Sequence, residues 1–192
     1  MKKIISTVCL LCLFGAIHAQ AFKIGENRSA FGVGFGWTFK ERLSNSLHLP
    51  SPNASVERSI IPFKDIGFIS VGAQFGFHYG YHNGTVPLTQ VDYKQSWTHV
   101  YFLPRFSLYY HEFFDEDDFP SNIDLYAGIG LGFNYLSHDY SPDVLLKSDR
   151  NGFNLGYNFF AGARYYFKPN AAVFGELGYG LSFLNVGLTI RY

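Results

Sequence analysis

Large apolar side chains recur at every second position over most of this chain. In the closing stretch from Leu184 to Tyr192, each apolar residue is followed by Asn, Gly, Thr or Arg. A repeat of two residues places all the apolar side chains on one face of an extended strand, whereas a helix requires a repeat near 3.6. The pattern therefore predicts an all-β protein.

The same alternation predicts seven strands, and an eighth is expected near residues 54–61. The seven are Phe31–Phe39, Ile69–Tyr81, Val100–Tyr110, Ile123–Tyr135, Phe153–Phe167, Val173–Tyr179 and Leu184–Tyr192. The eighth, Ala54–Ile61, alternates less cleanly, because Arg58 falls on its apolar face. Six of the seven segments have the roughly 9 to 11 residues that a strand needs to cross a bilayer.

The connections between these strands alternate in length. Pro62–Asp65, Glu112–Asn122 and Lys168–Asn170 are short or turn-like, whereas Glu41–Asn53, His82–Ser96 and Leu136–Asn151 are longer. The final connection, Gly180–Ser182, is the short exception. Short turns at one end and longer loops at the other are typical of bacterial outer-membrane barrels.

The two faces of the predicted strands differ in bulk. One face carries large aliphatic and aromatic residues, while the other is mostly glycine with scattered polar and charged residues. Exposed in water, the bulky face would promote aggregation, but in lipid it is required. Glycine suits the narrow interior of an eight-stranded barrel. Because closure leaves no unpaired edge, we expect an eight-stranded antiparallel up-and-down transmembrane β-barrel.

The first 20 residues are expected to be a secretory signal peptide, which leaves residues 21–192 as the barrel domain. Lys2 and Lys3 precede an apolar run that is too short to span a bilayer as a helix. Both cysteines, Cys9 and Cys12, lie in this segment, so we expect no disulfide in the exported chain. Without Lys2 and Lys3, 13 basic residues face 15 acidic ones, and no basic field indicates nucleic acid.

Three stretches resemble the small outer-membrane β-barrel proteins of Gram-negative bacteria, OmpX-like in architecture. They are "IDLYAGIGLGFNY", "GARYYFKPN" and "FGELGYGLSFLNVGLTIRY". The resemblance implies eight strands, a periplasmic N-terminus and a last strand that the barrel-assembly machinery reads. Tyr192 matches that assembly signal, although Phe is commoner there. Outer-membrane lipid and lipopolysaccharide are the other expected partners, and the resemblance supplies no established activity.

Candidate catalytic and metal-binding residues are few. The five carboxylates of "HEFFDEDDFP" (111–120) lack the spacing and glycine turn of a calcium loop, so a solvated turn is expected. His78 and His99 fall on the lumen-facing parity, but we expect no convergent metal ligands and no cofactor. A lipid-modifying enzyme would need a Ser or Asp beside a His; Ser44, Ser46, His48 and Ser51 in the first loop offer the one candidate set. A solvated loop is preferred.

Arg164 and Glu176 are predicted to form a structural pair in the lumen. Both lie on the lumen-facing parity, six residues before and six after Asn170, so they are expected to stand opposite each other. Arg105 or Arg191 and nearby tyrosines are expected to join them. The sequence thus predicts a non-enzymatic barrel with a structural or surface-interaction role. The alternatives are a lipid-modifying enzyme and, less favoured, a narrow pore, since eight strands leave no aqueous channel.

Overall fold

The computed structural model describes residues 25–36, 47–63, 67–85, 92–110, 122–141 and 151–192. Its strands are β1 (Asn27–Phe35), β2 (Leu47–His48), β3 (Ser51–Phe63), β4 (Gly67–Thr85), β5 (Asp92–Tyr110), β6 (Ile123–Ser141), β7 (Gly152–Lys168), β8 (Ala171–Tyr179) and β9 (Leu184–Arg191). In this part of the chain there is no helix long and apolar enough to cross a membrane. The expected signal peptide, Trp37, Phe39 and the acidic segment 111–120 lie outside the described residues.

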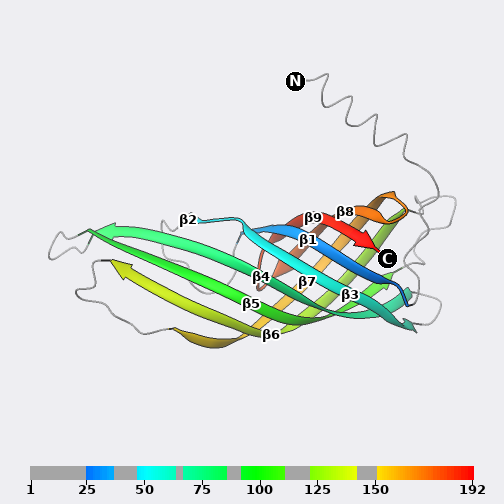
Figure 1. Ribbon diagram of the computed structural model, residues 1–192, viewed down its shortest axis with the longest axis horizontal. Coiled ribbons are helices and arrows are strands. Elements are labelled where there is room, and N and C mark those ends of the chain that lie inside the picture. Colours follow the sequence, from blue (N-terminus) through cyan, green and yellow to red (C-terminus); the bar gives the residue numbers. More distant parts are fainter. Residues whose placement is uncertain (1–24, 37–46, 64–66, 86–91, 111–121, 142–150) are drawn as a thin grey trace, which may run out of the picture.

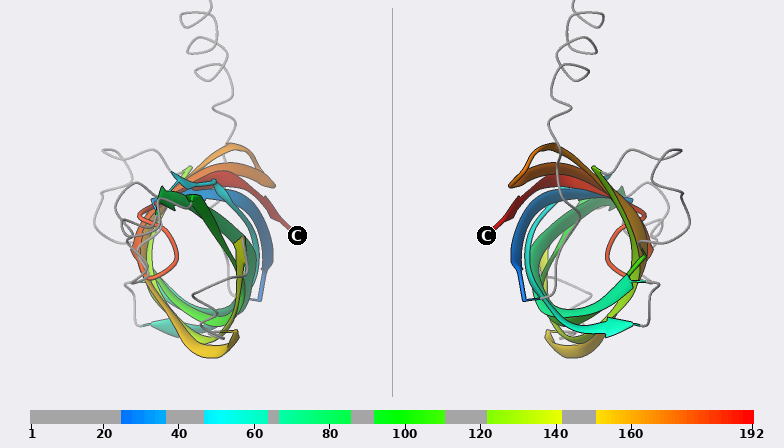
Figure 2. Two further views of the ribbon diagram at one scale, coloured as in Figure 1. Left: turned by 90° about the vertical axis from the view of Figure 1, so that its left-hand side faces the viewer. Right: turned by 90° about the vertical axis from the view of Figure 1, so that its right-hand side faces the viewer.

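Eight of these strands close into one antiparallel ring. The order around the ring is β4-β3-β1-β9-β8-β7-β6-β5, and the pairing of β4 with β5 completes it (Figure 2). The two-residue β2 continues the line of β3 and pairs with β4 at Tyr81 and Gly80. The predicted eight-stranded antiparallel barrel is therefore confirmed.

The two ends of the barrel differ in the length of their strands. β4, β5 and β6 have 19 residues each, whereas β1 and β8 have nine and β9 has eight. The three long strands extend well beyond the others at one end, here named the outer end (Figure 1). The opposite end, named the turn end, holds the two-residue β7–β8 turn and Tyr192.

Several strand boundaries differ from the sequence prediction. The segments 82–85, 92–96 and 136–141 were expected in loops but belong to β4, β5 and β6. Toward the outer end, polar residues occupy both faces of these strands, so the two-residue alternation fades although the backbone pairing continues.

The opening strand also lies earlier than the predicted Phe31–Phe39. β1 runs from Asn27 to Phe35, because Gly36 then adopts a positive φ of 71° that turns the chain. The eighth predicted strand is confirmed as β3, and the face that carries Arg58 points outward, as the alternation predicts. Val56 and Arg58 face outward, while Ser55, Glu57 and Ser59 are buried.

Candidate functional site: the filled lumen and the apolar outer face

Six buried charged side chains meet in the half of the lumen toward the turn end. This set, named the lumen charge cluster, comes from six different strands and balances three positive with three negative groups: Arg28, Glu57, Arg105, Asp124, Arg164 and Glu176. Unpaired charges are costly to bury, so a neutral set with short contacts is the arrangement that a closed lumen tolerates.

Glu57 lies at the centre of the cluster. Its Oε1 is 2.5 Å from Nε of Arg105, and its Oε2 is 3.7 Å from Nη2 of Arg164. The hydroxyl of Tyr109 donates to Oε2 of Glu57 and accepts from Nη1 of Arg164. One carboxylate thus ties β3 to β5 and β7 across the barrel.

Glu176 forms the second anchor of the cluster. Nη2 of Arg105 lies 2.6 Å from its Oε1, to which the Tyr126 hydroxyl also donates at 2.9 Å. The side-chain amide of Asn185 donates to the other oxygen at 3.2 Å. Because Arg105 bridges Glu57 and Glu176, the pairs form one network rather than separate contacts.

The third carboxylate, Asp124, pairs with Arg28 at the turn end. Nη2 of Arg28 donates to Oδ2 of Asp124 at 3.2 Å, and both side chains are buried. The guanidinium of Arg28 also lies over the ring of Tyr109, 4.6 Å from its centroid. Tyr109 therefore contacts both parts of the cluster.

The predicted pairing of Arg164 with Glu176 is wrong in register. Arg164 stands opposite Phe174, and Glu176 stands opposite Gly162, two residues from the predicted register. The turn is centred between Pro169 and Asn170 and not at Asn170, which accounts for one residue, and an irregularity between Tyr166 and Lys168 adds the second. A shift of two preserves the face of each side chain, so both are buried in the lumen as expected. Of the expected helpers, Arg105 joins the network, whereas Arg191 binds the carbonyl of Pro169 near the turn.

An apolar layer lies in the lumen next to the charge cluster, on the side of the outer end. Tyr101 and Leu103 of β5 contact Leu181, and all three are almost fully buried. Leu181 belongs to the β8–β9 connection, where Gly180 has a φ of 120°. A Cβ at Gly180 would meet the backbone around Tyr157, so the inward turn depends on this glycine.

A cluster of histidines lies beyond the apolar layer, toward the outer end. His48 Nδ1 and His78 Nε2 are 3.1 Å apart, and the rings of His78 and His99 lie 6.1 Å apart across the β4–β5 pair. His99 Nδ1 bonds to the Asn134 side-chain oxygen at 3.0 Å. This set of His48, His78 and His99 is named the histidine cluster. Within the described ranges, no three His, Cys, Asp or Glu residues converge to hold a metal ion.

The first-loop residues proposed for an enzyme do not form a serine–histidine pair where they are described. Ser51 is buried, and its hydroxyl donates to the carbonyl of Phe77 at 2.6 Å. His48 bonds instead to His78. Ser44 and Ser46 lie outside the described residues.

The outer face of the barrel carries large apolar side chains. Phe31, Phe133, Leu131 and Leu188 are between 49% and 63% exposed, while Gly130, next to Leu131, is buried. The alternation within Ile123–Tyr135 predicts large residues on the outer face and glycine on the lumen face, and this is confirmed for Leu131 and Gly130.

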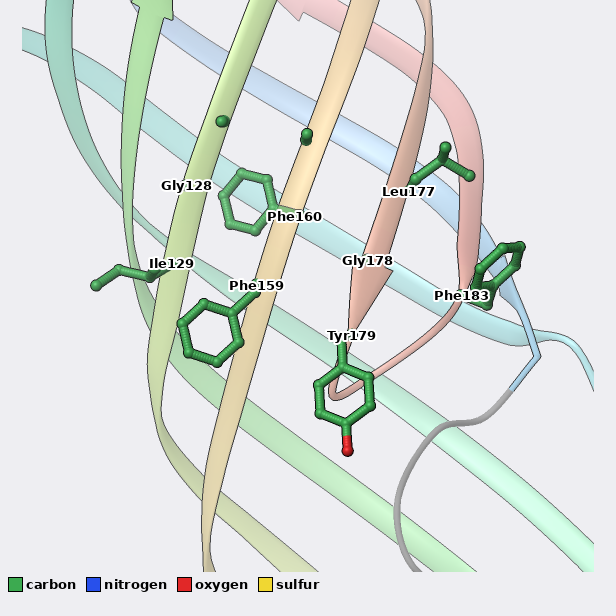
Figure 3. A pocket seen from close by; sticks show the side chains of 10 residues that line it. Gly128, Ile129, Phe159, Phe160, Leu177, Gly178, Tyr179 and Phe183 are labelled. Atoms are coloured by element: carbon green, nitrogen blue, oxygen red, sulfur yellow. The ribbon is translucent and has the colours of Figure 1, made fainter.

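A shallow hollow of about 600 Å³ lies on this outer face across β6, β7 and β8. Figure 3 shows Ile129, Phe159 and Tyr179 in a row across the three strands, with Leu177 and Phe183 to one side. Ala127 and Ala161, small neighbours on the same face, leave the space between them. The hollow is part of the apolar outer surface.

Sequence reasoning missed two features of the lumen. Arg28 was outside any predicted strand, although extending the Phe31 alternation backward by three residues places it on the lumen face. The convergence of His48 with His78 and His99 was also missed. The sequence held a partial signal, because His78 and His82 lie on one face of a predicted strand. The structure adds that the pairing of β4 with β5 sets His78 opposite His99.

No family model matches the sequence, and no curated protein matches it. Among solved structures, a de novo designed transmembrane β-barrel aligns over 89% of this chain and 98% of its own, with 14% identity and a TM-score of 0.51. The outer membrane protein OprG from Pseudomonas aeruginosa aligns over 91% and 99%, with 12% identity and a TM-score of 0.47. The N-terminal barrel domain of OprF from the same organism aligns over 88% and 98%, with 13% identity and a TM-score of 0.42. This chain has the fold of an eight-stranded antiparallel transmembrane β-barrel.

Proposed function

We propose that the protein is an integral barrel of the bacterial outer membrane that is non-enzymatic and acts through the surface at its outer end. One observation carries the membrane placement: large apolar side chains are exposed around the ring while charged side chains are buried inside it. This reversal of the usual arrangement requires lipid outside the barrel.

The filled lumen supports a structural or surface-interaction role rather than a pore. The lumen charge cluster and the layer of Tyr101, Leu103 and Leu181 occupy successive levels of the interior. An eight-stranded barrel has room for side chains and little else. Interaction with other molecules is therefore assigned to the outer end, where β4, β5 and β6 project (Figure 1).

Outer-membrane lipid, lipopolysaccharide and the barrel-assembly machinery remain the proposed partners. Tyr192 ends the outward-facing row of β9 and is 67% exposed, as a residue read by an assembly factor must be. Its hydroxyl lies 3.1 Å from the Ser29 hydroxyl, which joins the last strand to the first.

Membrane fractionation tests the placement. Expressed in a Gram-negative host, the protein should remain in the outer membrane after alkaline washing and migrate differently in gels before and after heating. In planar bilayers it should give no conductance steps. Recovery as a soluble periplasmic protein would overturn the proposal, and regular conductance steps would favour the pore instead.

The non-enzymatic role is tested on membrane lipids. Lipids from cells that express the wild type, the His48→Ala variant or an empty vector should have the same mass spectrum. A lipid species that appears with the wild type and disappears with His48→Ala would establish the enzymatic alternative.

A further inference from the structure

A polar island interrupts the apolar outer face where β1, β3 and β9 meet at the turn end. Arg58 of β3 pairs with Asn27 of β1, and the backbone of Asn27 exchanges hydrogen bonds of 2.9 and 3.0 Å with that of Tyr192. Ser29 and Tyr192 share a hydroxyl contact of 3.1 Å. The four polar side chains therefore lie within two register positions of each other.

Arg58 carries a charge that the described part of the barrel does not neutralise. Its side chain is exposed and makes no hydrogen bond or ion pair with another described residue. The outward-facing positions of β1, β3, β4 and β9 in the described ranges include no Asp or Glu. Arg28, on the neighbouring strand, has the opposite environment, because it is buried against Asp124.

A small hollow of about 150 Å³ lies beside Arg58. Besides Arg58, its lining includes Asn27, Val56, Val71 and Tyr192, and also Arg28 and Glu57, whose side chains are buried in the lumen. The hollow thus combines the N–H donors of Arg58 and Asn27 with two valines. The valines suit the glycerol and acyl portion of a lipid. Beyond Arg58 on the same strand, Ile60 and Phe63 are exposed and keep the surroundings apolar.

A charge on the lipid-facing surface is disfavoured unless it reaches an interface or a counter-ion. The planar guanidinium group matches the oxygens of a phosphate, and the long arginine stem allows the charged group to reach the headgroup layer. If the outer end faces the cell exterior, as the proposed function requires, the turn end lies in the periplasmic leaflet. This leaflet contains glycerophospholipids.

We infer that Arg58, with the side-chain amide of Asn27, binds the phosphate of a glycerophospholipid in the periplasmic leaflet. The lipid glycerol and first acyl carbons lie against Val56 and Val71. This inference rests on the proposed membrane placement and names one lipid class as its ligand.

Native mass spectrometry of the purified, folded barrel in non-ionic detergent tests the site. The probes are phosphatidylglycerol and a diacylglycerol with the same acyl chains. Arg58→Leu removes the charge, Arg58→Lys keeps it without the guanidinium fork, and Lys168→Leu removes a second exposed cation near the same end. A heating shift in gels confirms that each variant is folded.

Wild type and Lys168→Leu should retain phosphatidylglycerol equally, while Arg58→Leu should retain about tenfold less, as expected for a lost charge-assisted hydrogen bond. Arg58→Lys should fall between them, and no variant should retain diacylglycerol. Equal retention by wild type and Arg58→Leu would overturn the inference, as would equal retention of the two lipids.

A barrel that fractionates with the outer membrane but fails this test leaves the proposed function intact. A barrel that passes it but fractionates as soluble overturns the placement and, with it, the assignment of the lipid to the periplasmic leaflet.

Discussion

In the half of the lumen toward the turn end, each buried arginine lies against a carboxylate, whereas toward the outer end His48, His78 and His99 contact one another and Asn134. The first region joins six strands through opposite charges that have little access to water. The second is held by hydrogen bonds of the imidazole rings to one another and to an amide side chain. The charge cluster is therefore expected to dominate the stability of the barrel, and the histidine cluster to contribute little.

Glu57→Gln should produce the largest loss of stability. The substitution leaves Arg105 and Arg164 without a shared carboxylate and disturbs Tyr109, and breaking a buried pair costs about 3–5 kcal/mol. Urea unfolding in phospholipid vesicles measures the change. Glu26→Gln is the control, since Glu26 is half-exposed and lies 3.8 Å from Arg191; it should change the free energy of unfolding by under about 1 kcal/mol. Equal effects of the two variants would contradict the central role of Glu57.

Gly162→Ala should destabilise the same region through crowding. A Cβ at Gly162 would lie 2.9 Å from the Glu176 side chain and 2.9 Å from the Tyr126 hydroxyl, and overpacking of this kind costs about 1–3 kcal/mol. Gly175→Ala on the outer face of the adjacent strand meets no atom within 4 Å and should be neutral or slightly stabilising. If both substitutions are tolerated equally in vesicle unfolding, the lumen is less tightly packed than described.

A double-mutant cycle sharpens the register correction. Arg105→Gln and Glu176→Gln remove two groups that are 2.6 Å apart, and their coupling should be about 1–3 kcal/mol. The cycle of Arg164→Gln with Glu176→Gln should give a smaller coupling, because Tyr126 lies between them. Its ring contacts the Arg164 guanidinium and its hydroxyl donates to Glu176. A larger coupling for Arg164 than for Arg105 would restore the pairing that the sequence alone predicted.

His48→Ala should have the smallest effect. It removes a hydrogen bond between two imidazole rings, worth about 0.5–1.5 kcal/mol. The ring of His48 also lies 5.5 Å from that of Trp97, so the emission of Trp97 should shift in a Trp37→Phe background. A loss of stability as large as that of Glu57→Gln would mean that the two halves of the lumen do not differ as proposed.

The sequence predicted the faces of the strands but not the partners of the lumen side chains. Period-two alternation assigned Leu131, Gly130, Arg164 and Glu176 to the correct sides, because face depends only on parity. The β7–β8 register depends on the exact centre of the turn and on a local irregularity next to Lys168, and the alternation reveals neither.

Partner choice in the lumen also depends on contacts between strands that are not neighbours. Arg105 and Glu176 are 71 residues apart and lie on β5 and β8, so their contact exists only once the ring has closed. Strand ends were missed for a different reason. Beyond Leu136 both faces of β6 become polar, and no pattern then separates a strand from a loop.

Spin labelling at Leu131 tests the central claim most directly, namely that the outer face contacts lipid. Leu131 is 49% exposed and lies within the apolar row of β6. Residues 21–192 contain no cysteine, so Leu131→Cys provides a single site for the label. In vesicles, power saturation should show that the label is relaxed strongly by oxygen, which concentrates in lipid, and only weakly by a water-soluble nickel chelate. Strong relaxation by the nickel chelate and little by oxygen would place Leu131 in water and contradict the account.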